Sequence, residues 1–440
     1  SLLKDDSRLT DEDTVIYADT SMCEGVSKKE AHDRFKKNLY LKLQGDTGKN
    51  LPWGYLTGVR PSKIAYSMLE TGNSDEEIMS EFEEKHFVSH DKAELAMQVA
   101  KTEKKILEDI DYTNGYSIYI GIPFCPTTCL YCSFTSYSLA ANRSKVDLYL
   151  DALVKEMRFV ADRMKGRRLD TVYFGGGTPT TLEPEQLDRL LNELEADFDM
   201  STVKELTVEA GRPDSVTVQK LEVLKKHGVD RISINPQTMN DKTLEIIGRR
   251  HSATQVEEAF KLARSVGFDN INMDIILGLP GEGINELRYT LDKIKELKPE
   301  SLTVHSLAIK RAAALNIWRE KYEDLKFENS DETVSLAQKY AGDIGCMPYY
   351  MYRQKNMAGN LENVGYSVPG KECIYNILIM EEKQTIIAMG AGASTKAVFD
   401  ADQPNPRIER VENVKDLTSY ISRIDEMIER KRLFFDNNML

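Results

Sequence analysis

The chain has 440 residues, a net charge of −13 and a pI of about 5.2. An acidic balance of this size argues against an extended nucleic-acid-binding surface. Hydrophobic residues make up 41% of the chain and charged residues 29%, as in ordinary globular proteins, and no apolar run approaches the roughly 18 residues that a membrane span needs. The polar opening predicts no signal peptide, so we expect a cytoplasmic protein without a nucleic-acid partner or a membrane span.

Residues 1–112 are predicted to form a mainly helical accessory region. A Pro- and Gly-punctuated segment leads into a helix that begins at Ser62. The stretch Asp75–Asp109 places apolar residues such as Ile78 and Val99 among dense charges, which is the pattern of amphipathic helices.

Residues 113–320 are predicted to form an α/β barrel. Short β-branched or aromatic runs alternate with helical patterns, for example Val146–Met164 with Leu150, Leu153, Met157 and Val160 on one face. Six predicted strands suit a partial, open (β/α)6 barrel with its chemistry at the carboxyl ends of the strands. These strands are Ser117–Ile122, Thr171–Phe174, Glu205–Glu209, Arg231–Ile234, Asn270–Leu277 and Leu302–His305.

Residues 321–440 are predicted to form an α+β region that covers the substrate. Helices are expected at Thr333–Asp343 and Val414–Arg430, strands at Tyr349–Arg353 and Gln384–Met389. The Asn- and Gly-rich stretch Asn356–Lys371 is predicted to be a long loop.

Three of the six cysteines, Cys125, Cys129 and Cys132, fall within eight residues directly after the first barrel strand. Their spacing lets three thiolates converge on one metal centre. A structural zinc site needs four N or S ligands, and no fourth Cys or His lies nearby in the sequence. Three ligands suffice for an iron–sulfur cubane that keeps one iron open, which is the interpretation we favour over zinc.

The spacing C-x3-C-x-Φ-C, with Tyr131 as the aromatic residue Φ, resembles that of the radical S-adenosylmethionine (SAM) superfamily. The resemblance implies a [4Fe–4S] cluster bound by Cys125, Cys129 and Cys132, and one SAM molecule or two. It implies an enzyme in which SAM is cleaved to a 5′-deoxyadenosyl radical that removes a hydrogen atom from the substrate.

Further polar and glycine residues follow the predicted strands. A glycine triplet in this position is a tight turn or a backbone cradle whose exposed N–H groups favour an anion. The resemblance assigns SAM binding to these residues and also implies catalytic roles for Tyr119 and Glu209. The residues implied to bind SAM are Gly175, Gly176, Gly177, Thr178, Glu209, Gln237, Arg249 and Asp274.

The segments Leu51–Pro61, Ser306–Arg311 and Tyr352–Tyr366 are similar to those of the HemZ group, a coproporphyrinogen-dehydrogenase-like branch. This similarity implies oxidative decarboxylation of two propionates of coproporphyrinogen III, or action on a related tetrapyrrole, by a monomer that receives electrons from a reductase such as flavodoxin or ferredoxin. Cations would hold the substrate carboxylates. The candidates are Arg212, Lys310, Arg311 and Arg353, each of which is otherwise a solvated surface charge.

Two positions depart from the dehydrogenase pattern. Where those enzymes carry His and a further Cys, this chain has Gly121 and Phe134. A heme-binding chaperone and a radical SAM methyltransferase on the same scaffold therefore stay open as alternatives.

Overall fold

The computed structural model of the chain describes residues 26–58, 60–308, 329–354, 361–401, 403 and 406–438. They form two compact units. The smaller unit contains the described residues up to Thr57 and Ser74–Glu94, and the larger contains Gly58–Asn73 and the described residues from Leu95 onward. The three regions predicted from sequence follow a different division and stay a prediction; the boundary near residue 320 lies outside the described residues.

The smaller unit is mainly helical, as predicted. Helix α1 (Lys28–Thr47) begins at its cap Ser27, and α3 (Asp75–Ser80) begins with a capping box. A π-helical turn (Glu81–Lys85) follows α3 before α4 (His90–Leu107) begins. Trp53 is fully buried, and its backbone bridges to Val88.

Six parallel strands form the centre of the sheet in the larger unit, and they confirm the six predicted strands. They neighbour one another in chain order, as expected when helical crossovers connect successive strands. Their bounds are Tyr116–Ile122 (β1), Leu169–Gly176 (β4), Glu205–Glu209 (β5), Arg231–Ser233 (β6), Ile271–Leu277 (β7) and Ser301–Ser306 (β8).

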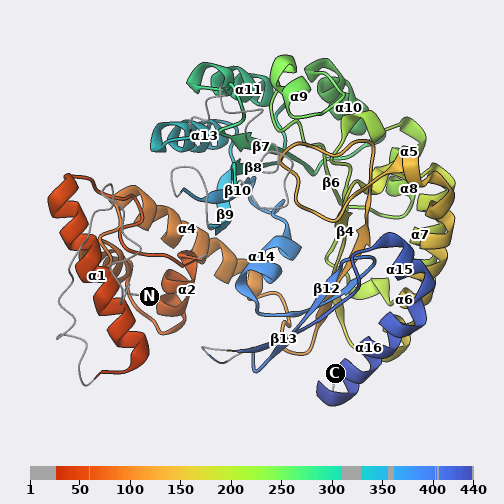
Figure 1. The fold of residues 1–440 in the computed structure, drawn as a ribbon, viewed down its shortest axis with the longest axis horizontal. Helices are drawn as coiled ribbons and strands as arrows, with labels where there is room; N and C mark the ends of the chain where they lie inside the picture. The colour runs from red at the N-terminus through yellow and green to blue at the C-terminus, as the bar shows by residue number, and fades with distance from the viewer. Residues whose placement is uncertain are drawn as a thin grey trace, which may run out of the picture. The chain divides into compact units, whose positions relative to one another are not determined.

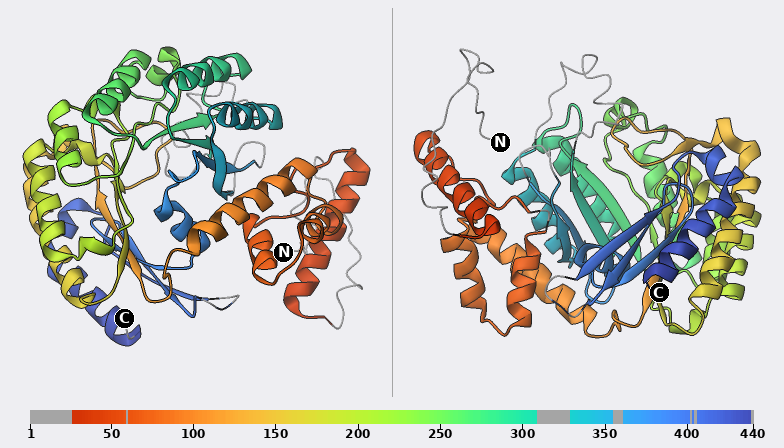
Figure 2. Two further views of the ribbon diagram at one scale, coloured as in Figure 1. Left: turned by 180° about the vertical axis from the view of Figure 1, so that it is seen from behind. Right: turned by 60° about the horizontal axis from the view of Figure 1, so that its bottom comes forward.

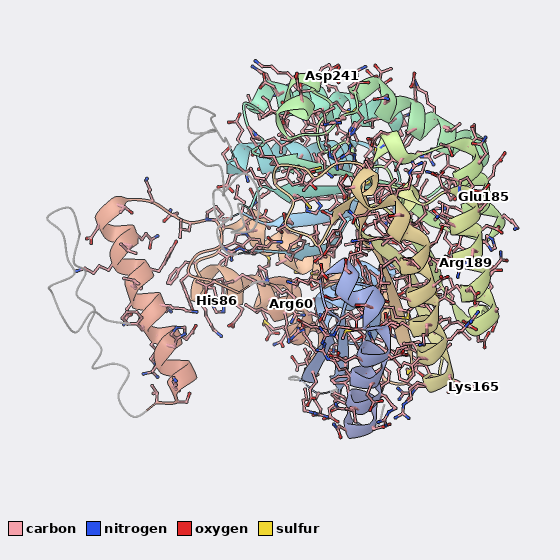
Figure 3. The ribbon with its side chains drawn as sticks, turned by 45° about the vertical axis from the view of Figure 1, so that its right-hand side comes forward. Arg60, His86, Lys165, Glu185, Arg189 and Asp241 are labelled. Atoms are coloured by element: carbon pink, nitrogen blue, oxygen red, sulfur yellow. The ribbon has the colours of Figure 1, made fainter. Side chains whose placement is uncertain are left out.

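Helices cover the outer face of this curved sheet, which confirms the predicted α/β barrel class (Figures 1 and 2). The apolar face predicted on α6 is buried, whereas Glu185 and Arg189 on α7 are exposed (Figure 3). The outer helices are α6 (Val146–Arg163), α7 (Pro184–Asp197), α8 (Val218–Lys226), α9 (Asp241–Ile246), α10 (Ala253–Val266), α11 (Ile284–Leu297) and α13 (Asp331–Asp343).

The C-terminal region extends the sheet at both ends. Strand β11 (Thr385–Met389) runs parallel to β1 and is followed by the antiparallel strands β12 (Ser394–Phe399) and β13 (Arg407–Glu412). At the other end, β10 (Asn363–Ser367) pairs antiparallel with β8 and with β9 (Met347–Tyr352). The remaining elements are α2 (Ser62–Glu70), β2 (Phe124–Cys125), β3 (Tyr137–Ser138), α5 (Leu139–Asn142), α14 (Ile374–Glu381), α15 (Leu417–Ser422) and α16 (Ile424–Asn438).

Two sequence predictions in this region were wrong. The described part of the predicted loop Asn356–Lys371 contains β10, because pairing on both sides overrides its weak strand composition. A Cβ at Gly365 would lie 1.9 Å from the ring of Tyr350, so the glycine that weakens the strand signal is required by packing. The single helix predicted over Val414–Arg430 is instead two helices, α15 and α16.

Helix α14, which was not predicted, lies on the inner side of the curved sheet (Figure 1). Its N-terminus is held by Glu205 at the start of β5, whose carboxylate accepts hydrogen bonds from the N–H groups of Ile374 at 2.6 Å and Tyr375 at 3.4 Å. The thiol of Cys373 donates to the same carboxylate at 3.3 Å. A buried anion at a helix N-terminus satisfies free N–H groups and the helix dipole together.

Within the described part of the chain, no helix combines the length and apolar composition that a membrane crossing requires.

Glu156 on α6 is the centre of a fully buried polar cluster behind β11. Its carboxylate pairs with Lys431 and accepts hydrogen bonds from the Tyr420 hydroxyl at 2.6 Å and the Gly390 N–H at 2.9 Å. The Asn413 amide adds a further bond at 2.8 Å. These contacts tie the glycine turn after β11 to the outer helices.

We expect Lys431→Met to lower the free energy of unfolding by about 3 to 5 kcal/mol, because the change leaves the Glu156 carboxylate buried without its cation. Denaturant unfolding followed by circular dichroism measures this loss. Arg430→Met, at an exposed neighbouring position, is the control and should cost less than about 1 kcal/mol. The double variant Glu156→Gln/Lys431→Met should recover part of the loss. Equal stability of Lys431→Met and the control would contradict the assigned role of the ion pair.

Candidate active site

A cavity of about 420 Å³ opens at the carboxyl ends of the parallel strands. Ligand sites of α/β barrels are built at this end, because the loops that follow each strand meet there. Most of the site residues predicted from sequence line this one cavity: Cys125, Cys129, Cys132, Gly176, Gly177, Thr178, Glu209, Arg212, Gln237, Arg249 and Asp274.

The other predicted residues lie elsewhere. Gly175 and Tyr119 lie directly behind the lining, where a Cβ at Gly175 would be 3.1 Å from the Tyr119 ring. Arg353 is buried but is not among the cavity-lining residues. Lys310 and Arg311 lie outside the described residues.

The cysteine loop is held in a defined shape by its neighbours. Strand β2, which ends at Cys125, pairs with the short strand β3, and the N–H of Leu130 donates to the carbonyl of Ile247 at 2.9 Å. The hydroxyl of Thr127 donates to the carbonyl of Gly248 at 3.0 Å. The Leu130 side chain is buried in an apolar cluster that includes Ile247. The loop is thus docked on the segment after α9 by main-chain bonds and by burial.

The three thiols face a partly buried environment. Burial raises the pKa of Cys125 to about 11 and also raises the pKa of Cys132. Cys125 and Cys132 therefore hold their protons at neutral pH and give them up when they bind iron. Among the described residues, no group of three or more His, Cys, Asp or Glu side chains is arranged around a single metal ion.

Two buried arginines contact the cysteine loop. Arg212 donates to the sulfur of Cys129 at 3.7 Å, and the charge of Arg249 lies close enough to Cys129 and Tyr131 to interact with both. One Nη of Arg249 also donates to the carbonyl of Asn235 at 2.5 Å. The Arg249 Nε has no hydrogen-bond partner among the described residues. Both side chains are less than a tenth exposed, so their charges act through little intervening water.

The glycine triplet supports the cysteine loop through its backbone. The N–H of Gly177 donates to the carbonyl of Ile122 and the N–H of Thr178 donates to the carbonyl of Phe124, both at 2.8 Å. A Cβ at Gly177 would lie 2.6 Å from the Phe124 oxygen, so only glycine permits this approach. The prediction of exposed N–H groups in the glycine triplet was therefore wrong for Gly177.

Glu209 ends β5 beside a group of stacked tyrosines. Its carboxylate accepts a hydrogen bond from the Tyr173 hydroxyl at 2.6 Å. The Tyr173 ring stacks on Tyr375 with 4.4 Å between centroids, and Tyr119 lies 6.2 Å from both rings. Burial raises the pKa of Glu209 to about 7, although the Tyr173 hydroxyl opposes the shift. Glu209 thus changes charge near neutral pH.

Asp274 on β7 is held as an anion by its neighbours. The amide of Asn272 donates to it at 2.7 Å, and Nε2 of His305 lies 3.9 Å from its carboxylate. Burial alone would raise the pKa of Asp274, but hydrogen bonds and charge from His305, with help from Asn272 and Thr303, hold it below its ordinary value. A fixed anion at this place suits hydroxyl or amino donors of a ligand.

Gln237 adopts a strained backbone conformation with φ of 66°. Its N–H donates to the carbonyl of Asp274 and its own carbonyl accepts from Ile276, which joins this loop to β7. The Oε1 atom of Gln237 is buried and finds no hydrogen-bond partner within the described part of the chain. Strain combined with an unsatisfied polar atom in a cavity indicates a ligand contact.

Several cavity residues escaped the sequence prediction: Tyr173, Arg231, His305, Tyr350, Tyr352, Asn376 and Met380. Tyr173 immediately precedes Phe174 and the glycine triplet, so its place near a strand end was a usable signal. Tyr350 and Tyr352 show the alternation of a strand, but their direction depends on how β9 joins the sheet. Asn376 and Met380 depend on the unpredicted α14.

Residues 119–294 match the family model described as the radical SAM superfamily. Over 414 residues the chain is 42% identical to the oxygen-independent coproporphyrinogen-III oxidase-like protein HemZ of Bacillus subtilis, an alignment that spans 92% of this chain and 82% of HemZ. The chain belongs to the HemZ family of radical SAM enzymes.

Heme chaperone HemW of Bacillus subtilis is 39% identical to this radical SAM chain over 194 residues, 44% of this chain and 50% of HemW. Among solved structures, coproporphyrinogen III oxidase (HemN) from Escherichia coli aligns with a TM-score of 0.56 and 22% identity, over 74% of this chain and 72% of HemN. HemN therefore has the same fold.

Radical SAM enzymes use a [4Fe–4S] cluster and SAM, and these are the cofactors of this chain. The residues on the cavity wall fit both groups. Three thiols share one docked loop, as a site-differentiated cluster requires. Beside them, four buried polar atoms have no hydrogen-bond partner among the described residues: Ser233 Oγ, Asn235 Oδ1, Gln237 Oε1 and Arg249 Nε. A polar ligand such as SAM would supply the missing partners.

We expect Cys129→Ala to abolish cluster binding, because the two remaining thiolates are too few ligands to hold the cluster. Iron and sulfide analysis after anaerobic reconstitution, with the visible absorbance of the cluster, measures the result. Cys346→Ala is the matched control: this thiol is buried outside the cavity, and its variant should bind as much iron as the unaltered protein. A full cluster in the Cys125/Cys129/Cys132 triple alanine variant would refute the ligand assignment.

The raised pKa of Glu209 predicts a specific pH dependence of stability. The folded state binds the proton of the Glu209 carboxyl more tightly than the unfolded state does. The stabilisation of the folded state by this proton is therefore fully present below about pH 4.5 and is lost as pH rises through about 7. From pH 5.5 to 8.5, the cluster-free protein should lose on the order of 2 kcal/mol more unfolding free energy than Glu209→Gln.

Denaturant unfolding at both pH values measures this difference. Glu185→Gln removes an exposed carboxylate on α7 and should follow the pH dependence of the unaltered protein. Parallel pH dependence of the protein and Glu209→Gln would show that Glu209 does not titrate in this range.

Proposed function

We propose that the enzyme oxidatively decarboxylates propionate groups of coproporphyrinogen III, or of a related tetrapyrrole, without oxygen. The chain resembles HemZ, named for likeness to coproporphyrinogen-III oxidase, over 92% of its length. An oxygen-independent coproporphyrinogen III oxidase of Salmonella typhimurium is 29% identical over 223 residues, 51% of this chain and 48% of that protein. The single observation that carries the proposal is that the cysteine loop and an aromatic wall share one cavity.

The cavity wall divides into two parts with different chemistry. On one side, we propose that Gln237, Arg249 and Asp274 bind SAM, with Arg249 on its carboxylate. The N–H groups of Gly177 and Thr178, at the end of β4, position the cysteine loop through the two backbone bonds already described. When bound and reduced by one electron, the cluster and SAM supply a 5′-deoxyadenosyl radical that removes a hydrogen atom from the substrate.

On the other side, aromatic and apolar groups from the C-terminal region complete the cavity. Tyr350 and Tyr352 come from β9, and Asn376 and Met380 come from α14. A largely aromatic wall suits the apolar body of a tetrapyrrole, and it supports a substrate-covering role for residues 321–440. We propose that Lys310 and Arg311 meet the substrate carboxylates. For each propionate, one hydrogen atom passes to the 5′-deoxyadenosyl radical, one electron passes to a one-electron acceptor from outside the chain, carbon dioxide leaves and a vinyl group remains.

A heme chaperone is the second candidate, since heme chaperone HemW is also a close relative over part of the chain. We further propose that the enzyme acts as a cytoplasmic monomer and takes its electron from flavodoxin or ferredoxin.

We expect coproporphyrinogen III to accelerate SAM cleavage by the reconstituted enzyme and to yield vinyl products. Anaerobic incubation with SAM and dithionite, followed by mass analysis of the tetrapyrrole and of 5′-deoxyadenosine, tests this. Tight heme binding without stimulated SAM cleavage would favour the chaperone. A product that gains a methyl group would identify a methyltransferase. Neither stimulation nor vinyl product would refute the proposed reaction.

We expect Arg249→Ala and Asp274→Ala each to weaken SAM binding at least tenfold, because each removes a charge-assisted contact worth roughly 1.5 to 3 kcal/mol. Equilibrium binding of SAM to the cluster-loaded variants measures this. Arg250→Ala removes an exposed cation next to Arg249 and serves as the control. Unchanged SAM affinity in both test variants would refute the assigned contacts.

A further inference from the structure

We propose that Arg212 raises the reduction potential of the iron–sulfur cluster by placing a charged hydrogen-bond donor on the sulfur of Cys129, and that Asp214 fixes this arginine in place. The inference rests on the cluster assignment and does not depend on which substrate the enzyme takes. It replaces the substrate-binding role predicted for Arg212 from sequence.

The guanidinium of Arg212 is held mainly by partners within the protein. Nε donates to one carboxylate oxygen of Asp214 at 2.9 Å and Nη2 donates to the other at 2.8 Å. Nη1 donates to the Thr127 hydroxyl at 3.0 Å and lies 3.7 Å from the Cys129 sulfur. Four of its five N–H donors therefore have partners and the residue is 3% exposed, which leaves no pair of free donors to hold a substrate carboxylate in a bidentate fork.

The backbone that carries Arg212 is also fixed. The Ser215 hydroxyl donates to the Arg212 carbonyl at 2.7 Å and lies 2.6 Å from the Thr180 hydroxyl in the loop after the glycine triplet. The buried ammonium of Lys220 donates to the carbonyls of Thr180 at 2.7 Å and Ser215 at 3.2 Å. Two strand-end loops are thereby joined, and the guanidinium is held where the cysteine loop passes.

The arrangement has a defined electrostatic sign. The Arg212–Asp214 pair is a dipole whose positive end faces the sulfur of Cys129. One-electron reduction adds a negative charge to the cluster, so a nearby cation and an N–H···S bond stabilise the reduced form and raise its potential. Arg249 also contacts Cys129, but its proposed partner is SAM. Arg212, whose partners all lie within the protein, therefore acts on the cluster potential whether or not SAM is bound.

The test is a reductive titration of the reconstituted full-length protein, without SAM, in which the reduced cluster is followed by electron paramagnetic resonance. Iron and sulfide content is measured first, so that a missing cluster in the unaltered protein, which would contradict the cofactor assignment itself, is recognised separately. At the potential that half-reduces the unaltered protein, Arg212→Gln should lower the ratio of reduced to oxidised cluster at least tenfold, which corresponds to 59 mV for a one-electron couple.

Two variants make the result specific. Arg212→Lys keeps the charge but loses the planar fork, and we expect it to lower the ratio by less than Arg212→Gln does. Arg250→Gln removes one exposed positive charge from the neighbouring segment and should leave the potential unchanged. If Arg212→Gln does not retain a cluster, Arg212→Lys carries the test, because its potential must still fall below that of the unaltered protein.

An unchanged or raised potential in a cluster-loaded Arg212 variant would overturn the proposal. A raised KM for the tetrapyrrole with an unaltered potential would do the same, since it would return Arg212 to a substrate-binding role. An equal fall of the potential in Arg212→Gln and Arg250→Gln would show that only net charge matters, which would also reject the contact proposed here.

Discussion

The rest of the site depends on the carboxylate of Glu205, which anchors a helix inside the barrel. Glu205 sits at the start of β5 and accepts hydrogen bonds from the first N–H groups of α14. Because the helix is held there, Tyr375 stacks against Tyr173, whose hydroxyl in turn meets Glu209 at the far end of β5. One buried carboxylate therefore sets the inner wall of the cavity and the environment of a second carboxylate.

The central sheet and the cysteine loop could be predicted from local sequence, whereas the cavity wall formed by α14 and β9 could not. The six strands were predictable because β-branched runs alternate with amphipathic helices. A parallel sheet that is buried on both faces requires strands of this apolar composition. Helix α14 was missed because Ile377–Met380 is a continuous apolar run, which carries no helical periodicity. Strand β10 was missed because Asn363 and Gly365 disfavour a strand until the Asn363 side chain bonds the N–H of Ser306 and Tyr350 covers the glycine.

The places of the proposed SAM-binding residues at strand ends were expected from the order of the motifs, but their backbone strain and pKa shifts were not. That Gln237 would be strained, or that Glu209 and Asp274 would be pushed toward opposite charge states, depends on contacts from other strands. Arg212 is the clearest example. In the sequence it is one more cation near a strand end, and only the fork with Asp214 two residues later shows that its donors face the protein. Its contacts with Thr127 and Cys129 form through tertiary packing, which no single-sequence pattern records.

Two backbone bonds, donated by Gly177 and Thr178, hold the strand segment that leads into the cysteine loop. Together with the Leu130 and Thr127 contacts, they fix the course of the loop through groups other than the three thiols. Chemical damage to one thiol, by oxidation or alkylation, therefore removes a cluster ligand and leaves these anchoring contacts in place.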